Sequence, residues 1–445
     1  MASLSLIELG CASFCREPFK PLYTPSRNSL GGFAPHERLL VTLARRDHVR
    51  GPLEDDVPTL EEPATRARFT RLAIQHRIYG LVISALLRSP VMQRLSPEVA
   101  QECQTSWHRL RRQAVMWALE RDRLLCRLEE EGLTPITLKG GALRDRIYTE
   151  PAERSLGDLD LLLPPSQLEP TYAVLSLLGY RILGSDELRE AYRRHHYHFR
   201  FAHPNGFIVE LHWALSRPGI SFQLDERAFL ARAVPTRAAG GHVLRIPSAE
   251  DMVLHMASQN EEDAFGRFSR LVDLDRIVSA TPSLDWAYLQ AAARTARAEV
   301  LLGLSLRLAE VLLRTPVPTG FINSLGLPPA CRVSLALLHP VSWVVSEPAQ
   351  RRMGPSELLL VWTTAGWRNR LRRARIAVRL EADPFTRVYL SQADKRRGET
   401  TDRPGSLRRL VALTCWQARL YLCGLGAILT SAGRRRLRFW TDASE

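Results

Sequence analysis

The stretch that decides the fold reads Gly157-Asp158-Leu159-Asp160-Leu161-Leu162-Leu163. Its run of leucines, which two prolines close, predicts a short buried strand. Because alternate residues of a strand point the same way, Asp158 and Asp160 share one face, and the neighbouring leucines point to the other. Two carboxylates this close repel each other, and a bound cation relieves the repulsion. The pair therefore indicates a metal site, although an Asp-x-Asp taken alone is more often a solvent-facing strand end.

The segment upstream predicts a strand, a glycine turn and the start of a helix. Residues 134–138 form a short apolar, β-branched run, Gly140-Gly141 follows, and Ala142 begins a helical pattern. Backbone N–H groups at such a turn can approach phosphate oxygens closely, and Lys139 adds a positive charge. We therefore expect Lys139, Gly140 and Gly141 to bind the phosphates of a nucleotide. A lone Gly-Gly is more often an ordinary turn, whereas Gly-Gly followed by Asp-x-Asp is much rarer by chance.

A third carboxylate lies downstream, on the apolar segment Ile208–Trp213. Glu210 and His212 share one face of the strand that this segment predicts. An acid in the middle of an apolar strand is costly unless it is paired or bound to a metal. Metal binding is one explanation for Glu210, and an ion pair with an arginine is the other. His212 either orients Glu210 or contacts the substrate, and simple burial beside the sheet explains it equally well.

Nucleotide transfer from a nucleoside triphosphate (NTP) needs clustered carboxylates and a clamp for the phosphate tail. Two Mg²⁺ ions, about 3.5–4 Å apart, usually bridge the triphosphate and activate the attacking oxygen. Mg²⁺ prefers hard oxygen ligands, which carboxylates supply. The sequence therefore predicts Mg²⁺, with Mn²⁺ as an alternative, bound to the catalytic residues Asp158, Asp160 and Glu210.

The order of these motifs resembles the polymerase-beta-type nucleotidyltransferase superfamily. Three segments are similar to a bacterial uncharacterised nucleotidyltransferase family within it, namely LKGGAL (Leu138–Leu143), R-x-x-G-D-L-D-L-L-L (Arg154–Leu163) and VELHW (Val209–Trp213). The resemblance covers about half of the chain, from Ala64 to Ser279. It implies an α/β (α+β) fold built on a mixed-sheet palm, with metal on the three acids and NTP phosphates at Gly140 and Gly141.

The segment also departs from the superfamily pattern. Gly-Gly stands where the superfamily often has Gly-Ser, so one hydroxyl contact is missing. The long interval between Gly141 and Asp158 carries Tyr148, Pro151 and Arg154, which reshape the phosphate pocket. Arg154 either neutralises triphosphate charge, as a nucleotide-binding residue, or forms a structural salt bridge.

Two further groups of residues are left outside the predicted site. His195, His196 and His198 lack the cysteine or nearby acid that would complete a zinc site, so metal is not expected there. Asp273 and Asp275 repeat the Asp-x-Asp spelling, but on a predicted helix, where positions i and i+2 diverge. We expect these two aspartates to support the site from outside or to have a structural role.

The chain is expected to divide into four regions, namely a loosely ordered lead-in (1–63), a helical N-terminal region (64–132), the nucleotidyltransferase core (133–247) and a helical, basic C-terminal region (248–445). Core elements are expected at 159–163, 167–178 and 180–183 and in a hairpin of 196–202 and 207–213. Later helices are expected at 251–260, 266–279, 284–314, 355–380 and 406–430. Ser248 is expected to cap the first of them.

The formal net charge of +14 comes from the C-terminal quarter. Residues 332–438 contain 21 Lys and Arg against 7 Asp and Glu. The basic amphipathic helix expected at 367–380 suits a nucleic acid, an anionic membrane surface or a partner protein, with a solvated arginine face as the alternative.

The cysteines and the termini bear on location. The seven cysteines are scattered without C-x-x-C spacing, which supports neither a zinc site nor a disulfide framework. The N-terminus lacks the basic region of a signal peptide, and the apolar stretch 410–431 is interrupted by Gln417 and Arg419. We therefore expect a cytoplasmic protein without a transmembrane segment.

The sequence as a whole predicts an enzyme that moves a nucleoside monophosphate from an NTP to an unknown hydroxyl-bearing acceptor and releases pyrophosphate. The acceptor is a small molecule, a peptide, a protein or RNA. The alternatives are a toxin-like transferase that modifies tRNA or protein, a tailoring enzyme that acts on a small molecule, peptide or glycan precursor, and a non-catalytic nucleotide-binding scaffold.

Overall fold

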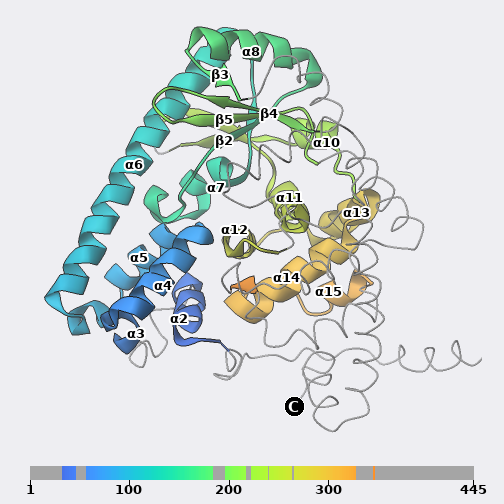
Figure 1. Cartoon of the computed structure of the whole chain (residues 1–445). Coiled ribbons are helices and arrows are strands. Elements are labelled where there is room, and N and C mark those ends of the chain that lie inside the picture. The colour runs from blue at the N-terminus through green and yellow to red at the C-terminus, as the bar shows by residue number, and fades with distance from the viewer. Residues whose placement is uncertain are drawn as a thin grey trace, which may run out of the picture.

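The computed structural model describes residues 33–46, 57–183, 196–216, 222–238, 240–262, 265–326 and 344–345. In Figure 1, N-terminal helices, a central sheet and a second group of helices follow one another along the chain. The expected helices at 355–380 and 406–430 and nearly all of the basic stretch 332–438 lie outside the described residues.

The core is a mixed sheet of seven strands in the order β3-β4-β5-β2-β1-β7-β6. The strands are β1 (Ile136–Thr137), β2 (Leu159–Leu162), β3 (Arg181–Ile182), β4 (His198–Ala202), β5 (Ile208–His212), β6 (Val234–Arg237) and β7 (Val243–Ile246). The pairs β2–β5 and β1–β7 are parallel, and the other pairs are antiparallel. The α/β (α+β) fold with a mixed sheet is therefore confirmed.

The strands and hairpin expected between 134 and 213 form as predicted. At the turn of the β4–β5 hairpin, Gly206 has a positive φ of 89°, and the Phe207 N–H donates to the Asn205 side-chain oxygen at 2.9 Å. Both features are typical of a tight turn, where glycine adopts left-handed backbone without a steric penalty.

The hairpin of β6 and β7 was not predicted. Strand β6 contains Pro235 and lies at the edge of the sheet, where the missing N–H of proline is tolerated. Its four residues are exposed or half-buried, so its sequence carries little apolar signal. Pairing of β7 with β1, which is distant in sequence, establishes this part of the sheet.

The N-terminal helices are α2 (Pro35–Ala44), α3 (Val57–Glu61), α4 (Pro63–Gln75), α5 (Tyr79–Leu87) and α6 (Pro97–Glu130), with a 3₁₀ turn at Pro90–Arg94. Helix α2 lies within residues 1–63, where the sequence predicts a loosely ordered lead-in. Its Leu39, Leu40 and Leu43 are almost fully buried, and the helix packs against α4 and α5. The short helix is therefore held by tertiary packing rather than by its own sequence pattern.

Helix α6 has 34 residues and is about 50 Å long at about 1.5 Å per residue. It runs from the N-terminal helices to the sheet (Figure 1). It ends just before Gly132, which has a positive φ of 71° and closes the helical region expected at 64–132. Of its apolar residues, Leu124 and Leu128 are buried, whereas Val115 and Leu119 are 58% and 60% exposed. The middle of α6 therefore bridges two packed parts of the molecule.

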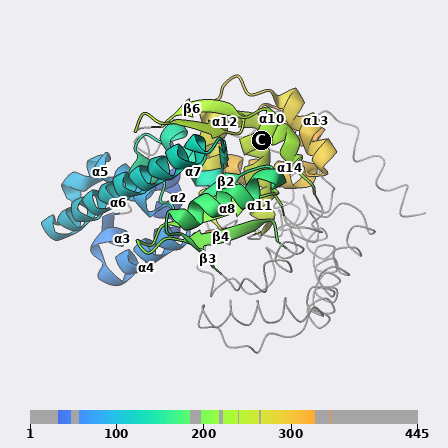
Figure 2. The ribbon, with the colours of Figure 1, turned by 90° about the horizontal axis from the view of Figure 1, so that it is seen from above.

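Two helix layers enclose the sheet. Helix α8 (Leu168–Leu177) covers one face, and α7 (Lys139–Ile147) and α11 (Ala249–Glu262) lie on the other (Figures 1 and 2). A short helix α10 (Glu226–Ala231) and 3₁₀ turns at Pro151–Glu153 and Pro165–Gln167 complete the core.

The remaining helices are α12 (Phe268–Ala280), α13 (Trp286–Ala296), α14 (Glu299–Leu313) and α15 (Phe321–Ser324). The single helix expected at 284–314 is wrong. It is divided between α13 and α14, because Arg297 adopts a left-handed backbone with φ of 58°. The cap at Ser248 is confirmed, since its hydroxyl oxygen accepts the Asp251 N–H at 3.2 Å.

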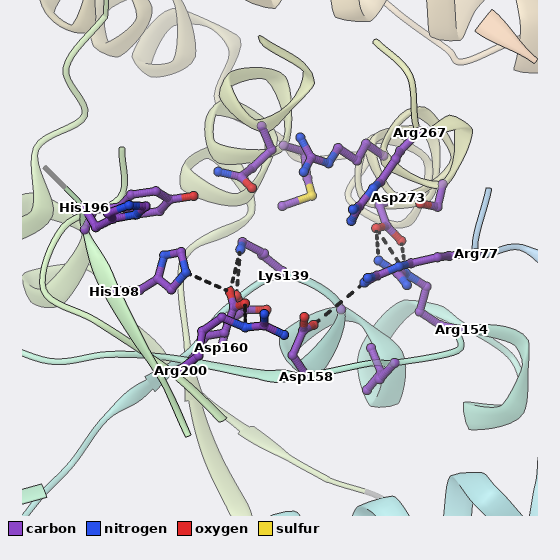
Figure 3. A pocket seen from close by; sticks show the side chains of 18 residues that line it. Arg77, Lys139, Arg154, Asp158, Asp160, His196, His198, Arg200, Arg267 and Asp273 are labelled. Atoms are coloured by element: carbon purple, nitrogen blue, oxygen red, sulfur yellow. Dashed lines mark hydrogen bonds and ion pairs between the residues drawn. The ribbon is translucent and has the colours of Figure 1, made fainter. Parts of the chain in front are cut away.

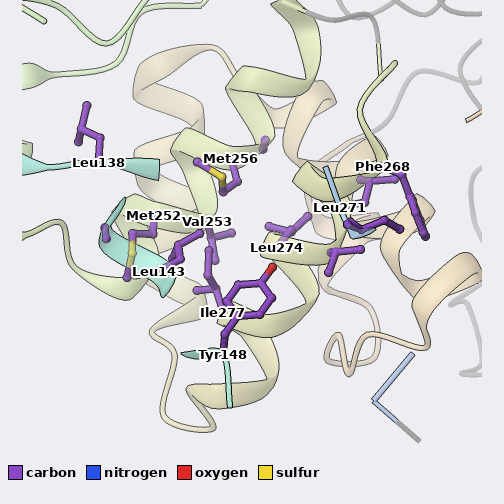
Figure 4. Packing of buried hydrophobic residues seen from close by; sticks show 14 of the residues in the cluster. Leu138, Leu143, Tyr148, Met252, Val253, Met256, Phe268, Leu271, Leu274 and Ile277 are labelled. Atoms are coloured by element: carbon purple, nitrogen blue, oxygen red, sulfur yellow. The ribbon is translucent and has the colours of Figure 1, made fainter. Parts of the chain in front are cut away.

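Helices α11 and α12 are anchored against α7 by a shared apolar layer. Figure 4 shows Met252 and Val253 of α11 and Ile277 of α12 gathered near Leu143 of α7. All of these side chains are buried. The packing matters for function because it fixes the first turn of α12 next to the residues that begin α7. None of the described helices combines the length and the apolarity needed to cross a membrane.

Candidate active site

A pocket of about 310 Å³ opens between the sheet and the first turn of α12 (Figure 3). Six of the seven residues that the sequence predicted for the site line this pocket, namely Asp158, Asp160, Glu210, Lys139, Gly140 and Arg154. Gly141 does not line it. Segments that are far apart in the chain therefore meet at one place.

Strand pairing brings two of the three carboxylates together. Strands β2 and β5 are parallel, and Asp160 lies directly opposite Glu210 in their register. The alternation of the strand sends Leu159 and Leu161 to the other face, where both are fully buried. Asp158 precedes β2 by one residue and lines the same pocket.

Lys139 places its ammonium between the paired carboxylates. Its Nζ lies 2.6 Å from an Asp160 carboxylate oxygen and 3.9 Å from a Glu210 oxygen. Lys139 is the first residue of α7 and has a left-handed φ of 48°, which is uncommon for a residue other than glycine. The negative charges of Asp160 and Glu210 therefore favour binding of a cation at the position that the ammonium occupies.

His212 contacts both Asp160 and Glu210 and is itself buried. Its Nε2 lies 3.0 Å from the Asp160 Oδ1 and 3.6 Å from the Glu210 Oε2, and the ring is almost fully buried. Burial disfavours the imidazolium, but the contacts with Asp160 and Glu210 outweigh it and raise the pKa of His212 above its usual value. Of the explanations open to the sequence, the geometry favours orientation of the carboxylates.

The three carboxylates differ in electrostatics. Burial, followed by the charges of Asp160 and Glu210, raises the pKa of Asp158 above its usual value. Burial acts the same way on Asp160, but Lys139 and His212 lower its pKa below the usual value. Burial likewise opposes ionisation of Glu210, but contact with His212 and the charge of Lys139 lower its pKa to about 2. Asp160 and Glu210 are therefore held as anions. Their negative charges disfavour ionisation of Asp158.

The expected glycine turn before the helix is wrong, because α7 already begins at Lys139 and both glycines lie in its first turn. Their surroundings differ. A Cβ at Gly140 would lie 2.4 Å from a methyl of Leu156 and 3.2 Å from the Arg154 guanidinium carbon. A Cβ at Gly141 would lie 2.9 Å from the Thr137 methyl and 3.3 Å from Leu159. Gly141 is thus required for close packing of α7 on the sheet, and Gly140 for close packing of α7 against Leu156 and Arg154 at the pocket wall.

Arg154 is held by Asp273, one of the two aspartates on α12. The Arg154 Nη2 and Nε each lie 2.9 Å from an oxygen of Asp273, and the Tyr148 hydroxyl donates to the same carboxylate at 2.6 Å. The guanidinium lines the pocket, but it donates hydrogen bonds to Asp273 and to the Ser155 carbonyl. Of the two sequence interpretations, the structure contains the salt bridge.

Asp275, the second aspartate on α12, has other partners than Asp273. Asp275 is fully buried and accepts a hydrogen bond from the Thr315 hydroxyl at 2.9 Å. Asp275 also lies 3.3 Å from Arg276 and 3.4 Å from Arg46. The expected divergence of the two side chains on a helix is therefore present.

The histidines upstream lie partly within the described residues. His195 lies outside them, while His196 and His198 line the pocket. Burial, with the charges of His212 and Lys139, lowers the pKa of His198 well below its usual value, so this ring is neutral. Ligand atoms of His198, Glu210 and His212 all lie within 4.8 Å of one another. The sequence missed this grouping because His198 gains its acidic neighbour only through strand pairing.

Several arginines of the pocket were also missed. Arg200 lies opposite Glu210 in the hairpin register, with its Nε 3.2 Å from a Glu210 oxygen. The predicted hairpin could have revealed this pair. Arg77 lies 3.8 Å from Asp158, and Arg267 and Arg270 approach from the start of α12. No local pattern signals these three, because each comes from a helix end outside the predicted core.

The donor set fits a hard divalent cation. Asp158, Asp160 and Glu210 offer carboxylate oxygens in one pocket, and the last two already share the ammonium of Lys139. Mg²⁺ and Mn²⁺ favour such oxygen ligands. The mixed group of His198, Glu210 and His212 offers nitrogen as well, but one His212 nitrogen already contacts Asp160. By ligand chemistry the all-carboxylate set is the better match for Mg²⁺, whereas His198, Glu210 and His212 are the group whose ligand atoms lie within 4.8 Å of one another among the described residues.

Comparison with known proteins agrees with this geometry. Among curated proteins, no sequence matches the chain. Residues 62–314 match a family described as "Uncharacterised nucleotidyltransferase". The match takes in the N-terminal helices from α4 onward, the whole sheet and the helices through α14. This protein therefore belongs to the uncharacterised nucleotidyltransferase family, which supports nucleotidyl transfer as its activity.

Proposed function

We propose that this protein transfers a nucleoside monophosphate from an NTP to a hydroxyl-bearing acceptor and releases pyrophosphate. We propose that Asp158, Asp160 and Glu210 hold Mg²⁺, which Mn²⁺ can replace. The observation that carries the proposal is the register that sets Asp160 beside Glu210, with the Lys139 ammonium between them. Membership of the nucleotidyltransferase family supports it.

The phosphate-binding part of the proposal rests on the start of α7. Lys139 and Gly140 line the pocket beside the carboxylates, and Gly140 keeps that wall free of a side chain. The flexible four-carbon stem of Lys139 lets its ammonium turn from Asp160 to a phosphate oxygen. Gly141 contributes by letting α7 approach the sheet, and Arg154 contributes positive charge from a fixed position on Asp273.

The reaction consists of one displacement at the α-phosphorus. A bond forms between the acceptor oxygen and the α-phosphorus, and the bond from phosphorus to the bridging oxygen of the β-phosphate breaks. The electron pair leaves with pyrophosphate, and the hydroxyl proton passes to solvent. Bound Mg²⁺ supplies charge that neutralises the triphosphate and polarises the reacting oxygens. The protein itself contributes positioning and preorganised charge, which dominate catalysis of phosphoryl-type transfer.

His212 has a positioning role in this proposal. It lies within contact distance of both Asp160 and Glu210 and is almost fully buried, so it restricts the rotamers of both acids. Groups that hold the ligands of a metal are commonly as important as the ligands themselves.

The test uses α-labelled NTPs and three separate acceptor pools, namely RNA, protein and small molecules. Wild-type protein with Mg²⁺ is expected to move the label from one NTP into one pool, and Asp160→Ala is expected to abolish the transfer. The pool that becomes labelled identifies the acceptor class. Failure of wild-type protein to bind any NTP in calorimetry would refute the proposal.

A further inference from the structure

The pocket is asymmetric in charge. Figure 3 shows Arg77, Arg154 and Arg267 together on one side of Asp160, with Asp273 among them, and His196 and His198 on the other side. Arg270, in the first turn of α12, also lines the pocket. Carboxylates on the arginine side are Asp158 and Asp273, and Asp273 accepts three hydrogen bonds from Arg154.

The surplus positive charge on this side comes from outside the palm. Arg77 follows α4, and Arg267 and Arg270 flank the start of α12. Arg77 is 36% exposed and approaches Asp158 no closer than 3.8 Å, which is a long ion pair. Like charges brought this close disfavour one another unless an anion joins them. The arginine side of the pocket is therefore suited to a polyanion.

A buried hydrogen bond holds the two arginine-bearing segments together. The ring Nδ1 of His76 accepts the backbone N–H of Phe268, the first residue of α12, at 3.1 Å. His76 is almost fully buried and directly precedes Arg77. The position of Arg77 relative to Arg267 is thus set by a rigid contact between the N-terminal helices and α12.

Gly140 connects this arginine side with the carboxylates. A Cβ at Gly140 would collide with Leu156 and lie 3.3 Å from the Arg154 Nη2 on one side, and Lys139, its neighbour in the chain, reaches Asp160 on the other. A phosphate chain with its α-phosphate at the carboxylates would pass Gly140 and reach Arg77. The amides at the start of a helix such as α12 add a favourable field for the negative charge.

We propose that Arg77, Arg267 and Arg270 form the subsite for the β- and γ-phosphates of the NTP. The inference rests on the proposed function and deepens it, because it assigns the triphosphate tail to residues from both helical regions that flank the palm. Guanidinium groups suit this task, since each can offer two parallel N–H donors to phosphate oxygens. The subsite explains how an enzyme of this kind distinguishes an NTP from the corresponding monophosphate.

The decisive experiment removes the Arg77 side chain without disturbing its backbone. Arg77 has a left-handed φ of 56°, so Arg77→Gly places the residue best suited to that conformation there. Arg297 is a matched control, because it is an exposed arginine with φ of 58° at the end of α13, away from the pocket. Arg267→Ala provides a second variant on the other segment.

Calorimetry would measure the binding of three probes in the presence of Mg²⁺, namely the preferred NTP, its monophosphate and inorganic tripolyphosphate. Arg77→Gly and Arg267→Ala are each expected to weaken NTP and tripolyphosphate binding about 10-fold or more, the scale of a lost charge-assisted hydrogen bond. Monophosphate binding is expected to stay unchanged, and Arg297→Gly is expected to bind all three probes like wild type.

The outcomes separate this inference from the proposed function. If wild type binds NTP and both arginine variants bind it equally well, the subsite is refuted while the proposed function stands. If wild type binds tripolyphosphate through Arg77 and Arg267 but binds no NTP, the polyanion subsite stands and the proposed function fails. Absence of binding to both probes by wild type refutes the two together.

Discussion

The same three-letter pattern, Asp-Leu-Asp, occurs twice in this protein with opposite results. Asp158, which directly precedes strand β2, and Asp160 within it line one pocket, where burial and then the charge of Asp160 raise the pKa of Asp158. Asp273 and Asp275 lie on helix α12 and diverge, the first to Arg154 and the second to Thr315. A strand repeats every two residues and a helix every 3.6, so only the strand brings i and i+2 together. The backbone, and not the pattern, decides which pair can share a cation.

The largest expected effect distinguishes the two pairs by activity. Asp160→Asn removes a charge at the proposed metal site and is expected to lower transfer by about 100-fold or more, as loss of a preorganised charge-stabilising group does. Asp275→Asn makes the same chemical change in the helical pair and is expected to leave the rate unchanged. Pyrophosphate release by equal amounts of folded protein measures both. Equal losses in the two variants would contradict the comparison.

The next effect concerns stability rather than rate. Asp273→Asn leaves the buried guanidinium of Arg154 without its charge partner, which costs roughly 3–5 kcal/mol of unfolding free energy. Urea unfolding at pH 7 measures the loss. A double variant with Arg154→Met is expected to recover part of it, because the uncompensated charge is then gone. A loss below about 1 kcal/mol for Asp273→Asn would show that the pair is not a structural one.

The smallest effect sharpens the contrast within α12. Burial raises the pKa of Asp275 above its usual value, despite its contacts with Arg276 and Arg46. The folded state therefore favours the protonated acid. The stability contributed by this group is fully present below the unfolded pKa and is lost as the pH rises through the folded pKa. Asp275→Asn mimics the neutral form and keeps an acceptor for the Thr315 hydroxyl.

Unfolding free energies of wild type and Asp275→Asn at pH 4.5 and pH 7.5 test this directly. The two proteins are expected to differ by about 1 kcal/mol or less, as most single changes without a named disruptive cause do. The difference should move in favour of the variant as the pH rises. If the unfolding free energy of the variant instead falls relative to that of wild type as the pH rises, the folded state stabilises the ionised carboxylate.

The parts of the fold that could be predicted are those with strong local patterns. The leucine run of β2 and the β4–β5 hairpin each carry their own periodicity or turn chemistry. The helix after β1 was also predicted, although it begins at Lys139 and not after the two glycines. The β6–β7 hairpin could not be predicted, because its edge strand contains Pro235 and lacks a buried face. The break at Arg297 was also hidden, since a left-handed arginine has no sequence signature comparable to glycine.

The candidate site follows the same division. The acids Asp158, Asp160 and Glu210 could be nominated because carboxylates on apolar strands are rare and expensive. Arg77 could not be nominated, since its neighbours in the chain reveal nothing of the pocket. The domain boundaries and the roles proposed for the site residues remain predictions.

The sequence by itself determined the kinds of groups available, namely three carboxylates on or next to two apolar strands, and a lysine and two glycines at the start of a helix. Periodicity and turn chemistry suffice for that, because they act over a few residues. Only the tertiary structure decided that Asp160 lies opposite Glu210, that Asp273 forms an ion pair with Arg154, and that the segment with Arg77 contacts the start of α12. Each of these contacts joins segments at least 50 residues apart, and such contacts depend on packing of the whole chain rather than on local conformation.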